Sequence, residues 1–467
     1  MLSTRSVLLL TSLALWGCKS KAPSASSPQS IGKQGLAQQR PSPLERPPGL
    51  AIRLAIKGGP PRLYRLPGLS ELTGAAKGKL PAVEAVEGLD AEAAELFVRT
   101  PKRELLGLDL ESGRVDTIAT DVQHAAIGPD GTLYAVDGKR RVTTLSRRTR
   151  LVWPQPLASE PRDLFGATDQ RLVALTSGRE PRILTAAADQ PPASRPIPAD
   201  GDMAATQWGD LVALASDSGV TFVDPLGRRD MAFVPIGDHP RVLLFSPSGH
   251  RVYVGKRGAL GLAVIDRYAH RELDGIALPA PIAALRLDPY GEWLLAAPGA
   301  GDTAWVVDLP VKQLTGALPT TWRGDLPTVT PDGTLLARQG ADVVAWSPDS
   351  LRERGRVVDG AADLWIATAW QPRGTRSAPA DGGAPAATDT ANAEGPLYVQ
   401  VSVSQNPAWS QEMAQQLSRA GLPAKVLPPG STEEGFRVVL GPYATREQAE
   451  AIGRKLGRPY WIFASTQ

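Results

Sequence analysis

Residues 397–403 have the sequence Leu-Tyr-Val-Gln-Val-Ser-Val, and this stretch decides the fold of the C-terminal part of the chain. Its four apolar residues occupy every second position, with Tyr398, Gln400 and Ser402 between them. Successive side chains of a β-strand point to opposite faces, so this period of two predicts a strand that is buried on one face only. The strand would open a small domain that extends over residues 396–467.

A helix is predicted directly after this strand. Asn406 is a suitable N-cap, Pro407 suits the first helical position, and Gly421 suits the C-terminal end. Between these signals, apolar residues recur at helical spacing, namely at Trp409, Met413, Leu417 and Ala420. The segment therefore continues from a strand into an amphipathic helix.

The remaining elements complete a small α+β fold. Two short apolar runs, 424–427 and 436–440, predict two strands, and Thr445 with Gln448 forms a capping box for a second helix. A last strand is predicted over 460–464. The order strand, helix, strand, strand, helix, strand is that of ferredoxin-like folds, in which both helices cover one face of the sheet. The opposite face is expected to be open.

These residues carry a family resemblance. The run from Tyr398 to Val401, the Gly-Leu break at Gly421, the stretch 436–443 and the Arg-x-x-Ala spacing of residues 446–449 resemble the SPOR domain. That family binds bacterial peptidoglycan, prefers glycan strands stripped of their stem peptides, and has many members at the division septum. The resemblance therefore implies a peptidoglycan partner. Residues 402–404 read Ser-Val-Ser where the family commonly has Gly-Ser-Phe, a departure that concerns glycan affinity more than the fold.

The open sheet face is the predicted glycan-binding site, because sugar rings need amides and hydroxyls at their edges and flat apolar groups beneath them. On the last strand, either Trp461 and Phe463 or Tyr460 and Ile462 face outward, and the first pair would provide a stacking platform. The alternative for any of these residues is an ordinary core aromatic or a solvated polar side chain. The predicted glycan-binding residues are Tyr398, Gln400, Ser402, Arg437, Val439, Trp461 and Phe463.

The N-terminus predicts export. Arg5 precedes an apolar run, residues 7–16, that is too short for a membrane-spanning helix and ends just before Cys18, the single cysteine of the chain. Residues 15–18, Leu-Trp-Gly-Cys, resemble the lipobox of bacterial lipoproteins, which implies a signal peptide over 1–17 and lipidation of Cys18. The residue after the anchor is Lys19 and not an inner-membrane retention aspartate, which favours an outer-membrane lipid anchor facing the periplasm. An ordinary secretory signal with a chance cysteine is the alternative.

Composition divides the rest of the chain. Residues 18–49 are rich in Ser, Pro, Gln and Lys and predict a disordered tether, and residues 371–395, rich in Ala, Pro and Gly, predict a linker. The formal net charge of +3 over 467 residues shows no basic cluster, so nucleic-acid binding is not expected.

The middle of the chain, residues 50–370, contains a repeat. Gly209, Gly249, Gly291 and Gly333, each in a turn signal before a short apolar strand, are spaced by 40, 42 and 42 residues. Gly131, the strand after Gln170 and Gly88 extend the series to seven units. Strands that end in Val-Asp or Ile-Asp, and turns of the Ser-Pro-x-Gly type, resemble YVTN and WD-like propellers.

We therefore predict an all-β, seven-bladed β-propeller, with six or eight blades as alternatives. Residues 50–56 would form a strand that completes the last blade beside 364–370 and closes the ring.

The propeller offers no clear catalytic signal. The four histidines show no metal-ligand spacing, and we expect no catalytic residue, metal or cofactor. One acid recurs per blade, at Asp109, Asp224, Asp266 and Asp308, which is the pattern of a turn cap. Two hypotheses remain. The first is a non-enzymatic envelope lipoprotein whose propeller rim binds a protein partner in cell division or wall remodelling. The second is a propeller enzyme, a lactonase-like hydrolase or a quinoprotein, that the C-terminal domain places at the wall.

Overall fold

A computed structural model describes most of the chain from residue 46 to residue 464. Within that range it leaves out 75–76, 91–92, 129–130, 147–148, 168–170, 177–179, 189, 198–201, 207–208, 210, 226, 228–229, 248, 250, 268, 373–395, 405–406, 420, 429–435, 446–447, 450–451, 453–455 and 457–460. The predicted signal peptide, Cys18 and most of the predicted tether and linker therefore lie outside the described residues.

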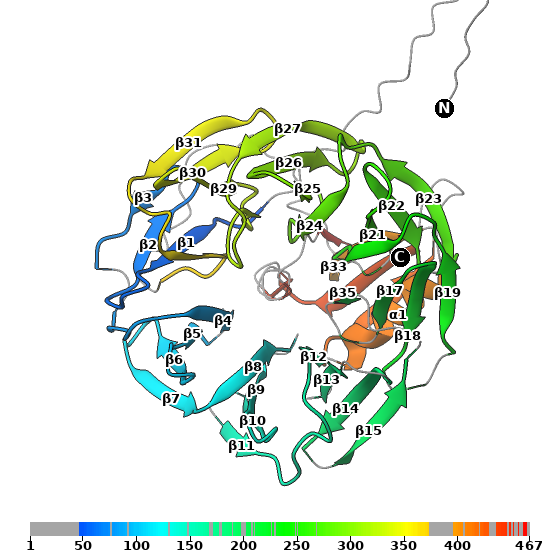
Figure 1. The fold of residues 1–467 in the computed structure, drawn as a ribbon, viewed down its shortest axis with the longest axis horizontal. Coiled ribbons are helices and arrows are strands. Elements are labelled where there is room, and N and C mark those ends of the chain that lie inside the picture. The colour runs from blue at the N-terminus through cyan, green and yellow to red at the C-terminus, as the bar shows by residue number, and fades with distance from the viewer. Residues whose placement is uncertain are drawn as a thin grey trace, which may run out of the picture. The chain divides into compact units, whose positions relative to one another are not determined.

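Eight four-stranded antiparallel sheets form a ring (Figure 1). Seven of these blades are continuous in sequence. The first four are β4–β7 (Ala85–Asp90, Glu95–Arg99, Leu105–Asp109, Val115–Ala119), β8–β11 (Val122–Ile127, Leu133–Asp137, Val142–Ser146, Thr149–Val152), β12–β15 (Asp163–Ala167, Arg171–Thr176, Arg182–Ala187, Gln190–Pro196) and β16–β19 (Met203–Ala205, Val212–Ser216, Gly219–Val223, Ala232–Pro235). The next three are β20–β23 (Pro240–Phe245, Arg251–Lys256, Leu262–Asp266, Arg271–Ile276), β24–β27 (Ile282–Leu287, Trp293–Pro298, Thr303–Asp308, Gln313–Pro319) and β28–β31 (Thr328–Val329, Leu335–Gln339, Asp342–Ser347, Arg352–Val357).

The eighth blade combines the two ends of the propeller. Its strands are β1 (Leu50–Leu54), β2 (Arg62–Arg65), β3 (Ser70–Glu71) and β32 (Leu364–Thr368). Strands β1 and β32 pair antiparallel, with Leu50 opposite Thr368, so the predicted pairing of the ends is confirmed. The predicted count of seven blades was wrong by one, because these strands build a separate blade and do not complete the seventh. The strands of this blade come from the two ends of the propeller sequence, so they do not form a continuous 40-residue repeat.

The repeated glycines share one turn. Their φ angles lie between +64° and +87°, and each amide donates a hydrogen bond to the carbonyl three residues earlier, at Gly131, Gly209, Gly249, Gly291 and Gly333. Each turn joins the first strand of a blade to the second, and the left-handed backbone favours glycine there. Gly88 differs, because it lies inside β4 and not in a turn. The expected turn at Gly88 is therefore absent, although the predicted blade is present as β4–β7.

Two of the recurring acids, Asp109 and Asp266, cap turns through their carboxylates. Asp109 Oδ1 accepts hydrogen bonds from the amides of Glu111 and Ser112, both at 3.0 Å. Asp266 Oδ1 accepts one from the amide of Ala269 at 2.9 Å. These contacts fix the turn between the third and fourth strands of a blade, as the sequence predicted.

Neighbouring blades bury their faces against each other. Phe222 of β18 and Phe245 of β20 come from adjacent blades, and their ring centroids are 6.2 Å apart within one apolar cluster. A single sheet has no other way to bury both of its faces, so the ring depends on every blade being present.

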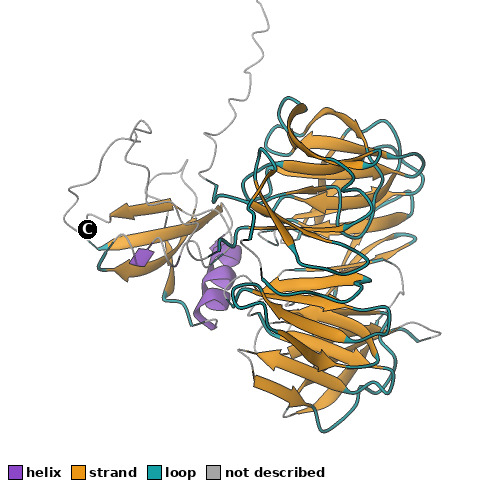
Figure 2. Cartoon of the chain, turned by 90° about the vertical axis from the view of Figure 1, so that its left-hand side faces the viewer, coloured by secondary structure: helices purple, strands orange, loops and turns teal. Residues whose placement is uncertain are grey.

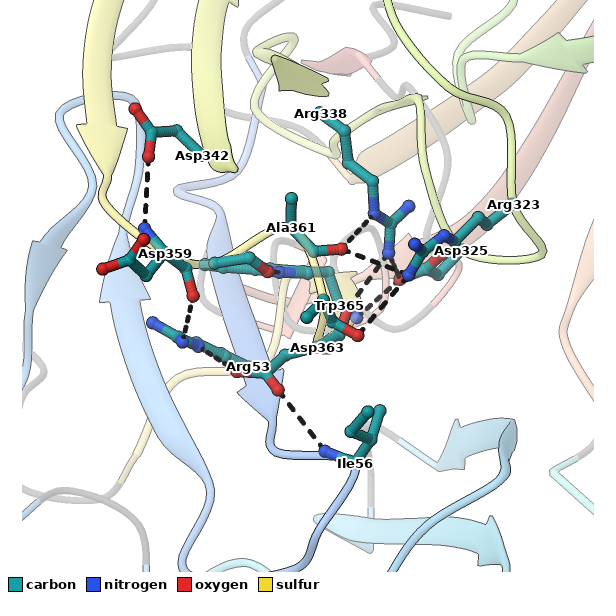
Figure 3. A network of polar contacts seen from close by, with 12 residues as sticks. Arg53, Ile56, Arg323, Asp325, Arg338, Asp342, Asp359, Ala361, Asp363 and Trp365 are labelled. Carbon is teal, nitrogen blue, oxygen red and sulfur yellow. Dashed lines mark hydrogen bonds and ion pairs between the residues drawn. The ribbon is translucent and has the colours of Figure 1, made fainter. Parts of the chain in front are cut away.

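A polar network joins the closing blade to the seventh blade (Figure 3). Arg338 Nη2 lies 2.7 Å from Asp325 Oδ2, and the exposed fractions of the two side chains are 3% and 8%. Arg338 also donates to the carbonyl oxygens of Ala361 and Asp363, at 2.8 and 3.0 Å. Arg53 of β1 lies 2.6 Å from the Asp363 carboxylate. The segment that leads into β32 is therefore held from both sides.

A second set of contacts holds the chain just before β1. The Arg46 guanidinium donates to both carboxylate oxygens of Asp288, at 2.9 and 2.6 Å, and to Glu292 at 2.6 Å. Asp288 is fully buried. Burial by itself would lower the pKa of Arg46, but hydrogen bonds and attraction from both carboxylates raise it. Gln371 Nε2 donates to the Pro48 carbonyl at 3.0 Å, so the two ends of the propeller lie side by side.

The C-terminal domain has the predicted strand and helix order over its described residues. Its elements are β33 (Leu397–Ser404), α1 (Pro407–Arg419), β34 (Ala424–Leu427), β35 (Phe436–Tyr443) and β36 (Trp461–Ala464). The sheet order is β34-β35-β33-β36, and α1 lies against the sheet (Figure 2). Strand β35 runs through Gly441 and Pro442, where we predicted its end.

Both predicted helices are supported. Helix α1 begins at Pro407, although the predicted cap Asn406 lies outside the described residues. Gln448, Ala449 and Ile452 are helical, and the Gln448 amide donates to Thr445 Oγ1 at 3.3 Å, as the predicted cap requires. Across the described residues, no helix is both long enough and apolar enough to cross a membrane.

Candidate functional site

The helices cover one face of the C-terminal sheet. Val399 and Leu440 are fully buried, and they pack in one cluster with Met413 and Leu417 of α1. Side chains alternate along a strand, so the residues next to Val399 and Leu440 in the sequence lie on the other, helix-free face of the sheet. The alternation seen in the sequence therefore identified the covered face correctly.

One row of residues crosses the helix-free face from edge to edge. Lys425 of β34 pairs with Val439 of β35, Val439 pairs with Gln400 of β33, and Gln400 pairs with Trp461 of β36. We call these four positions the Gln400 row. Strands are about 4.8 Å apart, so the row spans roughly 14 Å.

The predicted glycan-binding residues differ in accessibility. Val439 is fully buried, and Tyr398 is only 5% exposed. Gln400, Ser402 and Arg437 are half-buried. The structure therefore brings these residues to one sheet, but Tyr398 and Val439 form its floor and not its outer surface.

A register shift interrupts the alternation of β33 between Gln400 and Ser402. Beyond the shift, Ser402 lies opposite Val438, a fully buried core residue. The bulge thus separates Ser402 from the Gln400 row, a separation that period-two reasoning does not detect.

The last strand resolves which pair of residues shares the helix-free face. Ile462 packs against the helix-covered core, so positions 461 and 463 belong to the opposite face. In register, Phe463 pairs with Tyr398 and Trp461 with Gln400. The side chains of Trp461 and Phe463 lie outside the described residues, and their stacking role stays a prediction.

Lys425 also lies on the helix-free face, although it is not among the predicted glycan-binding residues. Its ammonium donates to the Tyr398 hydroxyl at 3.0 Å and lies 4.1 Å from the centroid of the Tyr398 ring. Ala424 and Val426 pack toward the core, so the parity of this short strand would have placed Lys425 on the helix-free face. The ammonium and the ring therefore form a cation–π contact on this face.

The propeller contains a cavity of about 510 Å³ that is lined by its inner strands. Four consecutive blades line it: three of them contribute apolar residues, and Arg162, Asp163 and Asp202 supply the charges. Arg162 Nε lies 2.7 Å from the Asp163 carboxylate, so these two charges largely offset each other. Among the described residues, no three His, Cys, Asp or Glu side chains come together as metal ligands would.

The fold and the site define a β-propeller joined to a small α+β domain with one helix-free sheet face. Residues 393–458 match the SPOR domain family, which confirms the predicted C-terminal domain. A SPOR domain implies peptidoglycan binding and a place in the cell envelope. No curated protein matches the sequence of the chain.

Solved structures resemble the propeller. A dihydro-heme d1 dehydrogenase, NirN, solved in complex with DHE, has 14% identity and a TM-score of 0.52, over 71% of this chain and 77% of NirN. AztD of Citrobacter koseri has 10% identity and a TM-score of 0.52, over 69% of this chain and 98% of AztD. At these identities the likeness shows the fold alone.

Proposed function

We propose that this protein is an outer-membrane-anchored periplasmic lipoprotein that binds peptidoglycan glycan strands and presents its propeller as a protein-interaction scaffold. Cell division or cell-wall remodelling is the process that fits such an arrangement. The observation that carries the proposal is the Gln400 row, which crosses a helix-free sheet face in a domain that matches the SPOR family. Denuded glycan strands are the expected ligand.

The row supplies the chemistry that a glycan requires. Gln400 offers an amide donor and acceptor at a half-buried position, beside the fully buried Val439. The aromatic positions 461 and 463 adjoin Gln400 and Tyr398 in register. An elongated, mostly uncharged polymer would lie across such a row.

Removal of the Gln400 amide is expected to weaken binding to isolated peptidoglycan sacculi by about five- to tenfold, because a hydrogen-bonding group at a binding site contributes about 1–1.5 kcal/mol. The measurement is a pull-down of the full chain with Gln400→Ala, using untreated and amidase-treated sacculi. Cys18→Ser is included in all samples to avoid lipid-driven adsorption. Gln415→Ala, on the exposed side of α1, is the matched control. Unchanged retention of Gln400→Ala would remove this residue from the site, and no retention of the parent chain would overturn the proposed function.

The lipid anchor has its own test. Cys18→Ser in the full-length chain is expected to move the protein from the membrane fraction to the soluble periplasmic fraction, since no acyl chain remains to hold it. Sucrose-gradient fractionation of the parent chain should place it with outer membranes. A Cys18→Ser variant that still sediments with membranes in the absence of peptidoglycan would contradict the anchor.

The enzyme alternative would use the cavity of the propeller, which has a size typical of small-molecule sites. We favour a scaffold, because Arg162 and Asp163 offset each other there. The test is Asp163→Asn combined with Asp202→Asn, in cells whose wall phenotype depends on this protein. A scaffold retains its function with both substitutions, whereas loss of function at normal protein levels would favour an enzyme.

A further inference from the structure

On the β34 side of Gln400 the surface is cationic, and the predicted glycan-binding residue Tyr398 lies beneath that charge. Tyr398 is 5% exposed, and the exposed Lys425 lies over its ring with the ammonium 4.1 Å from the centroid. A ligand that approaches the Gln400 row from the β34 side therefore meets the ammonium of Lys425 before the ring of Tyr398.

The charge of Lys425 is not neutralised by the described part of the protein. No described carboxylate forms an ion pair with it, and its hydrogen bond goes to the neutral Tyr398 hydroxyl. An ammonium has three N–H donors, and among the described residues only the Tyr398 hydroxyl accepts from one of them, which leaves two for a ligand. The contact with Tyr398 also restricts a flexible side chain and lowers the entropy lost when Lys425 binds a ligand.

A peptidoglycan strand changes charge when its stem peptides are removed. Each stem is joined to its sugar acid by an amide. Hydrolysis breaks that C–N bond, transfers the oxygen of water to the acyl carbon, and releases the peptide with a protonated amine. The sugar retains a carboxylate where a neutral amide had been. A denuded strand is therefore a regularly anionic polymer.

We infer that Lys425 is a specificity-determining residue that binds the carboxylates exposed on denuded glycan strands. This inference rests on the proposed glycan-binding function of the same face. Lys425 and Gln400 occupy one row and are separated by the single position of Val439. The amide of Gln400 would contact neutral sugar groups, whereas the ammonium would distinguish a carboxylate from the amide of an intact strand.

The test uses the full chain with Cys18→Ser and two soluble ligands, measured by isothermal titration calorimetry at low salt. One ligand is denuded glycan oligosaccharide, and the other is the same oligosaccharide with its carboxylates capped as methylamides. The parent chain is expected to bind the capped ligand about three- to fivefold more weakly, as befits one solvent-exposed charge pair. The difference should shrink at high salt, where such a pair is screened.

Lys425→Gln is expected to bind both ligands equally, at about the affinity of the parent chain for the capped ligand, and Lys425→Arg should retain the preference. Arg419→Gln, which removes an exposed charge at the end of α1, is the matched control and should keep the preference. Equal binding of both ligands by the parent chain would overturn the role of Lys425 while leaving glycan binding intact. Binding of neither ligand would instead overturn the proposed function itself.

Discussion

Replacing Arg338 by methionine is expected to lower the free energy of unfolding of the propeller by about 3–5 kcal/mol, the usual cost of removing one partner from a buried ion pair. Asp325, 8% exposed, would lose its ion-pair partner. The carbonyl oxygens of Ala361 and Asp363 would lose a donor in the same step. These groups hold the segment that leads into β32, so the lost contacts would destabilise the junction where the ring closes (Figure 3).

The measurement is urea denaturation followed by tryptophan fluorescence, for which Trp365 is a local reporter because its amide donates to Asp325 at 2.8 Å. The midpoint of thermal unfolding should fall by roughly 4–8 °C. Arg356→Met is the control, since Arg356 pairs with Asp342 and Glu353 at the surface and its loss should leave the midpoint nearly unchanged. Equal effects of the two substitutions would show that the buried pair does not stabilise the closure.

Replacing Arg46 by alanine is expected to have the second-largest effect, a loss of about 3 kcal/mol. The fully buried carboxylate of Asp288 would lose two hydrogen bonds from the guanidinium, and Glu292 would lose one. Asp288 would keep its bonds from the amides of Tyr290 and Glu292, both at 3.1 Å, which limits the loss. The chain before β1 would then be released from the sixth of the seven continuous blades.

Hydrogen–deuterium exchange distinguishes this local effect from general destabilisation. In Arg46→Ala, faster exchange is expected first in β1 and β32, because these strands pair at the junction that Arg46 supports. Arg62→Ala, at an exposed position on β2, should leave the exchange of both strands unaltered. If β1 and β32 kept their protection in Arg46→Ala, the guanidinium would not contribute to closure.

Local patterns predicted most of the elements. Alternation in residues 397–403 identified β33 and its buried face, and the positions of Pro407 and Gly421 identified α1. The repeated turn glycines identified five of the seven continuous blades, because each of these turns requires the same left-handed backbone within a few residues. Such features depend on near neighbours in the sequence, so the sequence displays them directly.

The missed features depend on contacts between distant residues. Tyr398 and Lys425 are separated by 27 positions, and the burial of one beneath the other becomes visible only when β33 and β34 share a sheet. The bulge that separates Ser402 from the Gln400 row arises from the pairing of β33 with β35. Neither strand by itself contains a signal for that register.

The sequence by itself determined the repeated blade, the strand and helix order of the C-terminal domain and the resemblance to a peptidoglycan-binding family, because periodicity and turn chemistry are local. The tertiary structure alone decided the number of blades and the charge of the candidate binding face. The eighth blade exists only after β1 meets β32, more than 300 residues away, and the cationic surface exists only after Lys425 covers Tyr398. Both follow from packing between segments that no local pattern connects.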